Sequence, residues 1–231
     1  MHRLILIFST LLLIVLSLIT LIAKDNTTST LKENESIQLS KYRQLYEELK
    51  LENEVCFVGF CQAMKGFDKI EVKKNILTFI DFSKASTEER FYVIDIEQKK
   101  ILYKSVVAHG KNSGGNYTTS FSNKKGSNQS SLGFFLTDKT YQGRNGLSLV
   151  LKGLEKGIND NAQTRAVVIH GADYANPKMA KSAGRLGRSF GCPALPQELT
   201  KPIIEAIKDG SLIYAYSDNF NNEYLKNSTI L

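Results

Sequence analysis

The strongest constraint on how this chain folds is an uncharged run of twenty residues near its N-terminus, residues 4–23, in which only four hydroxyl side chains interrupt the aliphatic sequence. A helix rises about 1.5 Å per residue, so the run is long enough to cross a hydrocarbon core of about 30 Å. Secretory h-regions are shorter, about 7–15 residues, and end at small residues. The sequence Leu21-Ile22-Ala23-Lys24 is a poor cleavage site. We therefore predict that residues 1–23 form an uncleaved signal-anchor, with a cleaved signal peptide as the alternative.

Both alternatives export the rest of the chain and leave its short basic end, His2 and Arg3, in the cytoplasm. Residues 24–35 are polar and have no apolar period, which is typical of a flexible spacer. The formal net charge of +7 suits an anionic environment such as a wall polymer or a membrane surface. A nucleic-acid partner is not predicted, because the sequence has no helix-turn-helix pattern, no aromatic RNA-binding motif and no block of basic residues.

The exported part divides into a helical extension and a mainly β domain. Apolar residues recur at three- and four-residue steps within residues 36–70, which predicts helices. Residues 71–217 contain several short runs rich in β-branched and aromatic residues, which is typical of strands. The predicted strands are 76–81, 90–96, 101–108, 133–137, 147–151, 166–169 and 211–217, with short helices at 178–183 and 199–208. We expect a sandwich or a mixed sheet, followed by a polar tail over residues 218–231.

The chemistry of the domain centres on one cysteine and one histidine. Cys192 stands between Gly191 and Pro193, on a constrained turn, and His170 ends a predicted strand. A thiol is a weak nucleophile until it ionises, and a nearby imidazole is the usual means of making the thiolate. Backbone N–H groups of such a turn can hold an oxyanion. The pair therefore indicates a site for acyl transfer, although a lone Cys is more often an inert buried side chain.

The other two cysteines do not suggest a second site. Cys56 and Cys61 are five residues apart, so on a helix they point to different faces and cannot form a disulfide with each other. An odd number of cysteines in an exported chain leaves at least one thiol free unless two chains pair.

The spelling around the pair resembles the catalytic signature of the L,D-transpeptidases, the wall cross-linking enzymes of bacteria. His170-Gly171 is followed by Gly187-Arg188-Ser189-Phe190-Gly191-Cys192-Pro193-Ala194, which is similar to the family branch written His-Gly-Ala…Gly-Arg-Ser-x-Gly-Cys-Pro-Ala. Phe190 stands where the common pattern has a second histidine, and Pro193-Ala194 stand where an Arg or Asn usually follows. The resemblance covers about residues 81–216, and it implies the fold of that family.

The resemblance also implies a mechanism. Cys192 would attack the carbonyl of diaminopimelate in a peptidoglycan stem tetrapeptide, His170 would take the thiol proton, and the carbonyl of Gly171 would fix the imidazole. The N–H groups of Gly191 and Cys192 would hold the oxyanion while terminal D-Ala leaves. The thioester would pass to a second stem peptide, giving a 3→3 cross-link, to water, giving L,D-carboxypeptidase activity, or to a protein amine of the envelope. No metal or cofactor is needed.

Five further residues are candidates for binding the substrate. Arg185 and Arg188 could clamp carboxylates, because guanidinium forks bind them bidentately, or could simply hold their loop. Ser189 could position the cysteine turn or touch the substrate. His109 stands at the start of a long polar loop, residues 111–131, and Tyr141 lies in a predicted turn; each could meet the substrate or have a structural role.

Two other functions remain open at this point. A cysteine peptidase acting on ordinary peptides would need the same Cys/His pair, and a catalytically inactive protein that binds the cell wall would need none of it. On the resemblance, we expect the domain to lie outside the cytoplasm in a bacterial cell envelope, anchored in the inner membrane, with peptidoglycan stem peptides as its partners.

Overall fold

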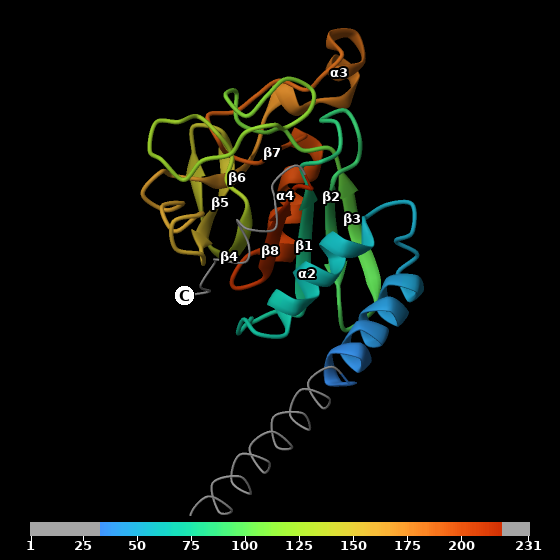
Figure 1. Ribbon diagram of the computed structural model, residues 1–231. Coiled ribbons are helices and arrows are strands. Elements are labelled where there is room, and N and C mark those ends of the chain that lie inside the picture. Colours follow the sequence, from blue (N-terminus) through green and yellow to red (C-terminus); the bar gives the residue numbers. More distant parts are fainter. Residues whose placement is uncertain (1–32, 219–231) are drawn as a thin grey trace, which may run out of the picture. The chain divides into compact units, whose positions relative to one another are not determined.

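The computed structural model describes residues 33–218 (Figure 1). The predicted signal-anchor, residues 1–23, lies outside the described residues, as does the tail beyond residue 218. Within residues 33–218 no helix is both long enough and apolar enough to cross a membrane. The chain divides into two compact units, residues 1–45 and residues 46–231. Residues 33–48 are helical, so the predicted helix begins inside the stretch that we assigned to a spacer.

The second unit is built on one mixed sheet of eight strands, in the order β3-β2-β1-β8-β4-β5-β6-β7 (Figure 1). The strands are β1 (Ile76–Asp81), β2 (Phe91–Asp95), β3 (Lys100–Ser105), β4 (Gly133–Gly143), β5 (Gly146–Gly153), β6 (Val168–Gly171), β7 (Ala194–Leu195) and β8 (Leu212–Tyr216). The pairs β1–β8 and β6–β7 are parallel and all the others are antiparallel. The prediction of a mainly β domain is therefore confirmed, in its mixed-sheet form.

Helices cover both faces of the centre of this sheet. Helix α2 (Phe57–Phe67) packs on β1 and β8, where Gly59 lets its backbone approach the rings of Phe79 and Tyr216. Helix α4 (Gln197–Ile207) packs on the other face, and its Ile203 and Ile204 join one core cluster with Ile80 and Ile213. Alternate residues of β1 and β8 thus meet different helices. This explains why all five residues of β8 are buried and why its sequence does not alternate between apolar and polar.

The largest error among the predicted strand boundaries concerns β4. Strand β4 runs on to Gly143, whereas the sequence suggested an end at Thr137 and a turn that began at Tyr141. The β4–β5 ladder shifts register between Thr137 and Thr140 and then continues to the Gly143–Gly146 pair. The outer half of β4 is polar and mostly exposed. The turn itself falls at residues 144–145, and Gly146 has the positive φ of 77° that such a tight turn favours.

The site is assembled at the β6–β7 end of the sheet. The parallel register pairs His170 with Ala194 and Gly171 with Leu195. The segment before the long loop lies on the other side of β7, because Ala108 forms an antiparallel bridge with Ala194. The chain around residues 106–110, strand β6 and the cysteine turn are therefore brought together although they are far apart in sequence.

Candidate active site

His170 is fixed by its own strand. Its side chain is buried on β6, and its Nδ1 lies 2.8 Å from the carbonyl oxygen of Gly171. Because a carbonyl can only accept, Nδ1 carries a proton, and in the neutral ring Nε2 is the nitrogen with the lone pair. Gly171 itself faces α4, where a Cβ would lie 2.3 Å from Oε1 of Gln197, so only glycine fits there without displacing that side chain.

The Cys192 thiol is half-buried and bonds to the backbone at the start of β6. Its Sγ accepts from the N–H of Val168 at 3.5 Å and donates to the carbonyl oxygen of Ala166 at 3.6 Å. Burial raises the pKa of the Cys192 thiol above its ordinary value, and the Val168 amide and the charge of Arg165 offset this only in part. The resting sulfur is therefore a neutral thiol with its proton directed at a carbonyl.

The imidazole and the thiol stand near each other without touching. Since Ala194 pairs with His170 in parallel register, Cys192, two residues earlier, lies beside Val168. Within residues 33–218 no hydrogen bond joins the two side chains, because the thiol bonds to residues 166 and 168. Rotation of the Cys192 side chain is the movement that would bring them together.

The turn that carries the cysteine is held by buried hydroxyl groups. Oγ of Ser189 donates to the carbonyl of Cys192 at 2.6 Å and accepts from the N–H of Gly191 at 3.0 Å. Oγ of Ser130 donates to the carbonyl of Gly191 at 3.1 Å. Gly191 has a φ of +130°, and a Cβ there would lie 2.9 Å from the carbonyl oxygen of Gln129. Ser189 therefore shapes the turn from the inside.

This bonding separates the two amides that the sequence suggested as oxyanion donors. The N–H of Gly191 is already donated to Ser189, whereas the N–H of Cys192 makes no hydrogen bond to any of residues 33–218. An oxyanion at this turn would thus find the Cys192 amide ready and would have to compete for the amide of Gly191.

The remaining predicted residues are distributed around the turn. Nη1 of Arg188 donates to the carbonyls of Lys111 and Gly114, at 3.1 and 2.9 Å, so this exposed guanidinium fastens the long loop. Arg185 donates to the carbonyl of its neighbour Leu186 at 3.0 Å. Both arginines thus have the loop-holding contacts that were one of their two predicted roles.

Two aromatic side chains reach solvent near the site. Tyr141 lies on β4 in the same row of the sheet as His170, since it pairs with Ser148 and Ser148 pairs with His170. Phe190, in the place of the family's second histidine, is 72 % exposed, and the Nζ of Lys111 lies 4.5 Å from its ring centroid. This contact is a cation–π pair at the edge of the cysteine turn.

His109 is not at the surface. It is 1 % exposed, and its Nδ1 accepts a hydrogen bond of 2.8 Å from Nη2 of Arg90, a fully buried arginine. The same guanidinium donates twice to the carbonyl of Val107, at 3.1 and 2.7 Å. Burial, and then the charge of Arg90, lower the pKa of His109 to about 4. His109 is therefore a neutral side chain that supports the loop from beneath, out of reach of a substrate in this conformation.

This burial predicts a pH dependence of stability. The unfolded chain takes up a proton on His109 near its ordinary pKa of about 6.5, whereas the folded chain resists protonation down to about 4. The free energy of unfolding should therefore fall as the pH is lowered from about 6.5 to about 4, by up to about 3 kcal/mol for this group. The free energy of unfolding is measured with urea at several pH values across this range. It should depend less steeply on pH in His109→Gln than in the unaltered chain. Equal slopes would contradict the prediction.

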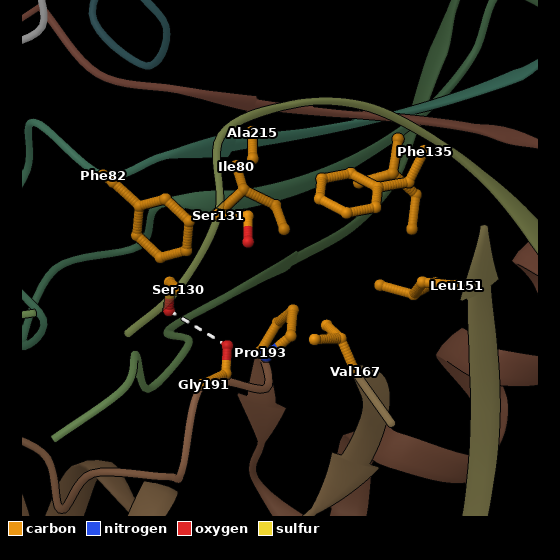
Figure 2. Close-up of a pocket in the computed structure, with 11 residues that line it drawn as sticks. Ile80, Phe82, Ser130, Ser131, Phe135, Leu151, Val167, Gly191, Pro193 and Ala215 are labelled. Carbon is orange, nitrogen blue, oxygen red and sulfur yellow. Dashed lines mark hydrogen bonds between the residues drawn. The ribbon is translucent and has the colours of Figure 1, made fainter. Parts of the chain in front are cut away.

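The long loop, residues 111–131, is held by contacts that the sequence did not suggest. Arg165, just before β6, donates to Ser122 and Gln129 carbonyls, both at 2.6 Å, and Ser130 joins the N–H of Gly110 to the cysteine turn. Figure 2 shows a small cavity beneath that turn, between Pro193, Val167 and the core residues Phe135 and Leu151. Neither Cys192 nor His170 lines it, and its walls include core residues, so it is not a binding site for groups that react with the thiol.

Within residues 33–218 no group of three or more His, Cys, Asp or Glu side chains could hold a metal ion.

Comparisons with known proteins give one sequence family. The model of a family described as "L,D-transpeptidase catalytic domain" matches residues 51–216, which include α2 and every strand of the sheet. No curated protein sequence matches the chain. Among solved structures, an L,D-transpeptidase from Mycobacterium smegmatis aligns at 15 % identity with a TM-score of 0.38, over 62 % of this chain and 58 % of its own. The helical cell shape determining protein Pgp2 from Campylobacter jejuni aligns at 14 % identity with a TM-score of 0.40, over 64 % and 49 %. The chain thus spans less than two thirds of the length of either protein.

Proposed function

Because the chain belongs to the L,D-transpeptidase catalytic domain family, we propose that it transfers an acyl group of a peptidoglycan stem peptide through a thioester on Cys192. The observation that carries the proposal is the pairing of strand β6 with the cysteine turn. It supports the proposal because β7 follows Cys192 by two residues and pairs with the strand that carries His170, whose Nδ1–H is held by the carbonyl of Gly171.

The first half-reaction uses the movement described above. The Cys192 side chain rotates from Ala166 toward His170, Nε2 takes the thiol proton, and the imidazolium keeps its Nδ1–H on the carbonyl of Gly171. The thiolate attacks the carbonyl of the third stem residue, diaminopimelate. The amide of Cys192 binds the oxyanion, and the amide of Gly191 joins it if it releases Ser189. Collapse breaks the C–N bond, and the imidazolium protonates the departing amine of D-Ala.

The second half-reaction runs the same proton transfer in reverse. Neutral His170 takes a proton from the incoming amine as that amine attacks the thioester, and then returns it to the sulfur as the C–S bond breaks. An amine of a second stem peptide gives a 3→3 cross-link, water gives a shortened tripeptide, and an amine of an envelope protein gives a covalent attachment. We propose the first of these acceptors, with the other two as alternative outcomes of the assay.

Location follows from the uncharged N-terminal run. Residues 1–23 are proposed to anchor the chain in the inner membrane, with the domain in the cell envelope outside the cytoplasm, where its +7 charge meets anionic wall polymer.

The test is a product analysis by mass spectrometry. The full chain is incubated with purified disaccharide-tetrapeptide, and the expected product is a cross-linked dimer that has lost one D-Ala. A tripeptide alone would mean that water is the acceptor. A casein-like protein serves as the second substrate, and its cleavage without any change in the muropeptide would overturn the proposal in favour of an ordinary cysteine peptidase. Unchanged muropeptide that nevertheless co-sediments with the protein on wall sacculi would mean an inactive wall-binding protein.

A further inference from the structure

Arg165 joins the long loop to the segment that leads into β6. Its guanidinium donates four hydrogen bonds into residues 122–131. The acceptors are the carbonyls of Ser122 and Gln129, both at 2.6 Å, and the hydroxyls of Ser131 at 2.5 Å and Ser127 at 3.3 Å. All four acceptors are neutral. A planar fork with several fixed donors suits this arrangement, which a lysine could not reproduce.

The same guanidinium packs against the cysteine turn. A Cβ on Gly191 would lie 3.4 Å from Nη2 of Arg165, so the two groups are in direct contact range. The carbonyl of Gln129, which accepts from Nη2, is also the nearest atom to that Cβ position, at 2.9 Å. The guanidinium therefore lies between the long loop and Gly191, and Cys192 is the residue that follows Gly191 in the chain.

Other groups that titrate or carry charge also stand around the sulfur. Tyr174 lies on the short helix Asp173–Ala175. Burial, and then the electrostatic interaction with Cys192, raise the pKa of its phenol to about 12. It therefore remains neutral below that pH. His170 lies along β6 and Arg188 lies on the turn itself, with its Nη1 on Lys111 and Gly114. Arg165 is the charged group whose Nη2 lies 3.4 Å from the Cβ position of Gly191, the residue before Cys192.

We propose that Arg165 is a positioning residue that fastens residues 122–131 onto the cysteine turn and stabilises the Cys192 thiolate with its charge. The inference rests on the proposed role of Cys192 as nucleophile, and it adds a residue that the family signature around that cysteine does not contain. The two parts are separable, because the clamp needs the guanidinium fork and the electrostatic part needs only a positive charge.

The electrostatic part is tested by the alkylation of Cys192 as a function of pH. The full chain reacts with iodoacetamide, an uncharged reagent that Arg165 cannot steer, and peptide-resolved mass spectrometry reports Cys192 separately from Cys56 and Cys61. Loss of a neighbouring cation raises a thiol pKa by about one unit or more. We expect the rate for Arg165→Gln to fall about tenfold at pH values below the midpoint of the profile, and the midpoint to move up correspondingly.

The clamp is tested by amide hydrogen exchange of residues 122–131. Arg165→Lys should keep the alkylation profile of the unaltered chain, because the charge remains, and should speed exchange in this segment at least several-fold, because a point donor cannot hold four acceptors. Arg165→Gln should speed it as well. The matched control is Arg144→Gln, which removes an equal charge from the exposed β4–β5 turn and should leave both readouts unchanged.

Each part has a result that overturns it. An Arg165→Gln profile that coincides with that of the unaltered chain removes the electrostatic role, and unaltered exchange of residues 122–131 in Arg165→Lys removes the clamp. If Arg165→Gln does not fold, Arg165→Lys carries the test alone, and a raised midpoint in this variant with unaltered exchange overturns both parts. Neither readout needs turnover. A chain that is inactive on muropeptides but shows the expected shifts would therefore refute the proposed function and leave this inference standing.

Discussion

Replacement of Cys192 by alanine is expected to abolish muropeptide turnover, with a loss of about 10⁴-fold or more, because no other group can form the acyl intermediate. The fold should be retained, since the turn is held by Ser189, Ser130 and the backbone, and the thiol contributes only two long contacts to residues 166 and 168. Turnover is measured as release of D-Ala, and folding as the thermal melting midpoint.

The matched control is Cys56→Ser, which changes an exposed thiol at the N-terminus of α2 and keeps a side-chain acceptor for the N–H of Gly59. It should turn over at the rate of the unaltered chain. A carbapenem offers a second readout, because its strained ring should acylate the nucleophile. Intact-mass measurement should find one adduct on the unaltered chain and on Cys56→Ser, and none on Cys192→Ala. Retained turnover in Cys192→Ala would remove the nucleophile assignment.

Replacement of His170 by glutamine should lower kcat/KM by about 10³-fold, because glutamine cannot take the thiol proton or return it to the leaving amine. Its amide can still donate to the carbonyl of Gly171, so the loss should not come from unfolding. A second measurement distinguishes two roles for His170: a base that takes the proton only during turnover, and one half of a thiolate–imidazolium pair that exists at rest. Because the resting thiol bonds to Val168 and Ala166, alkylation of Cys192 in the free protein should change little in this variant while turnover collapses.

The opposite pattern would contradict that picture. If His170→Gln slowed alkylation as much as it slowed turnover, the thiol and imidazole would already form a thiolate–imidazolium pair at rest. Near-normal turnover would instead point to another base. His109 is the other histidine among residues 33–218, and its burial under the loop makes it a poor substitute.

Much of the fold could be predicted because local sequence and tertiary structure agree. Strands β1, β2 and β8 are rich in β-branched and aromatic residues, and they lie at or beside the sheet's centre, where burial favours such side chains. Strand β4 was cut short because its outer half contains Asp138 and Lys139. These two residues fall at the register shift between Thr137 and Thr140, and their side chains are exposed, so no apolar pattern marks the continuation of the strand.

The residues proposed to react could be predicted from the sequence, but the residues that hold the cysteine turn and the long loop in place could not. His170 and Cys192 carry a motif, but Arg165 and Ser130 act through contacts 36 and 61 residues away, with Gln129 and Gly191 respectively. No local pattern marks such a contact. The same is true of His109, whose burial depends on Arg90, 19 residues earlier. The polar composition of residues 111–131 likewise does not show that the side chains of Ser113, Gln129 and Ser130 bond within the protein.

If the domain lies outside the cytoplasm, as we propose, the neutral state of its thiol would help to protect the protein from oxidation. Peroxides and disulfide reagents attack the anion, so susceptibility to them follows how much of the anion is present. Burial raises the pKa of Cys192, and its proton is directed at the carbonyl of Ala166, so little anion exists in the resting protein. Outside the cytoplasm, where no thiol pool repairs oxidised cysteines, such a design would preserve the reactive atom between turnovers.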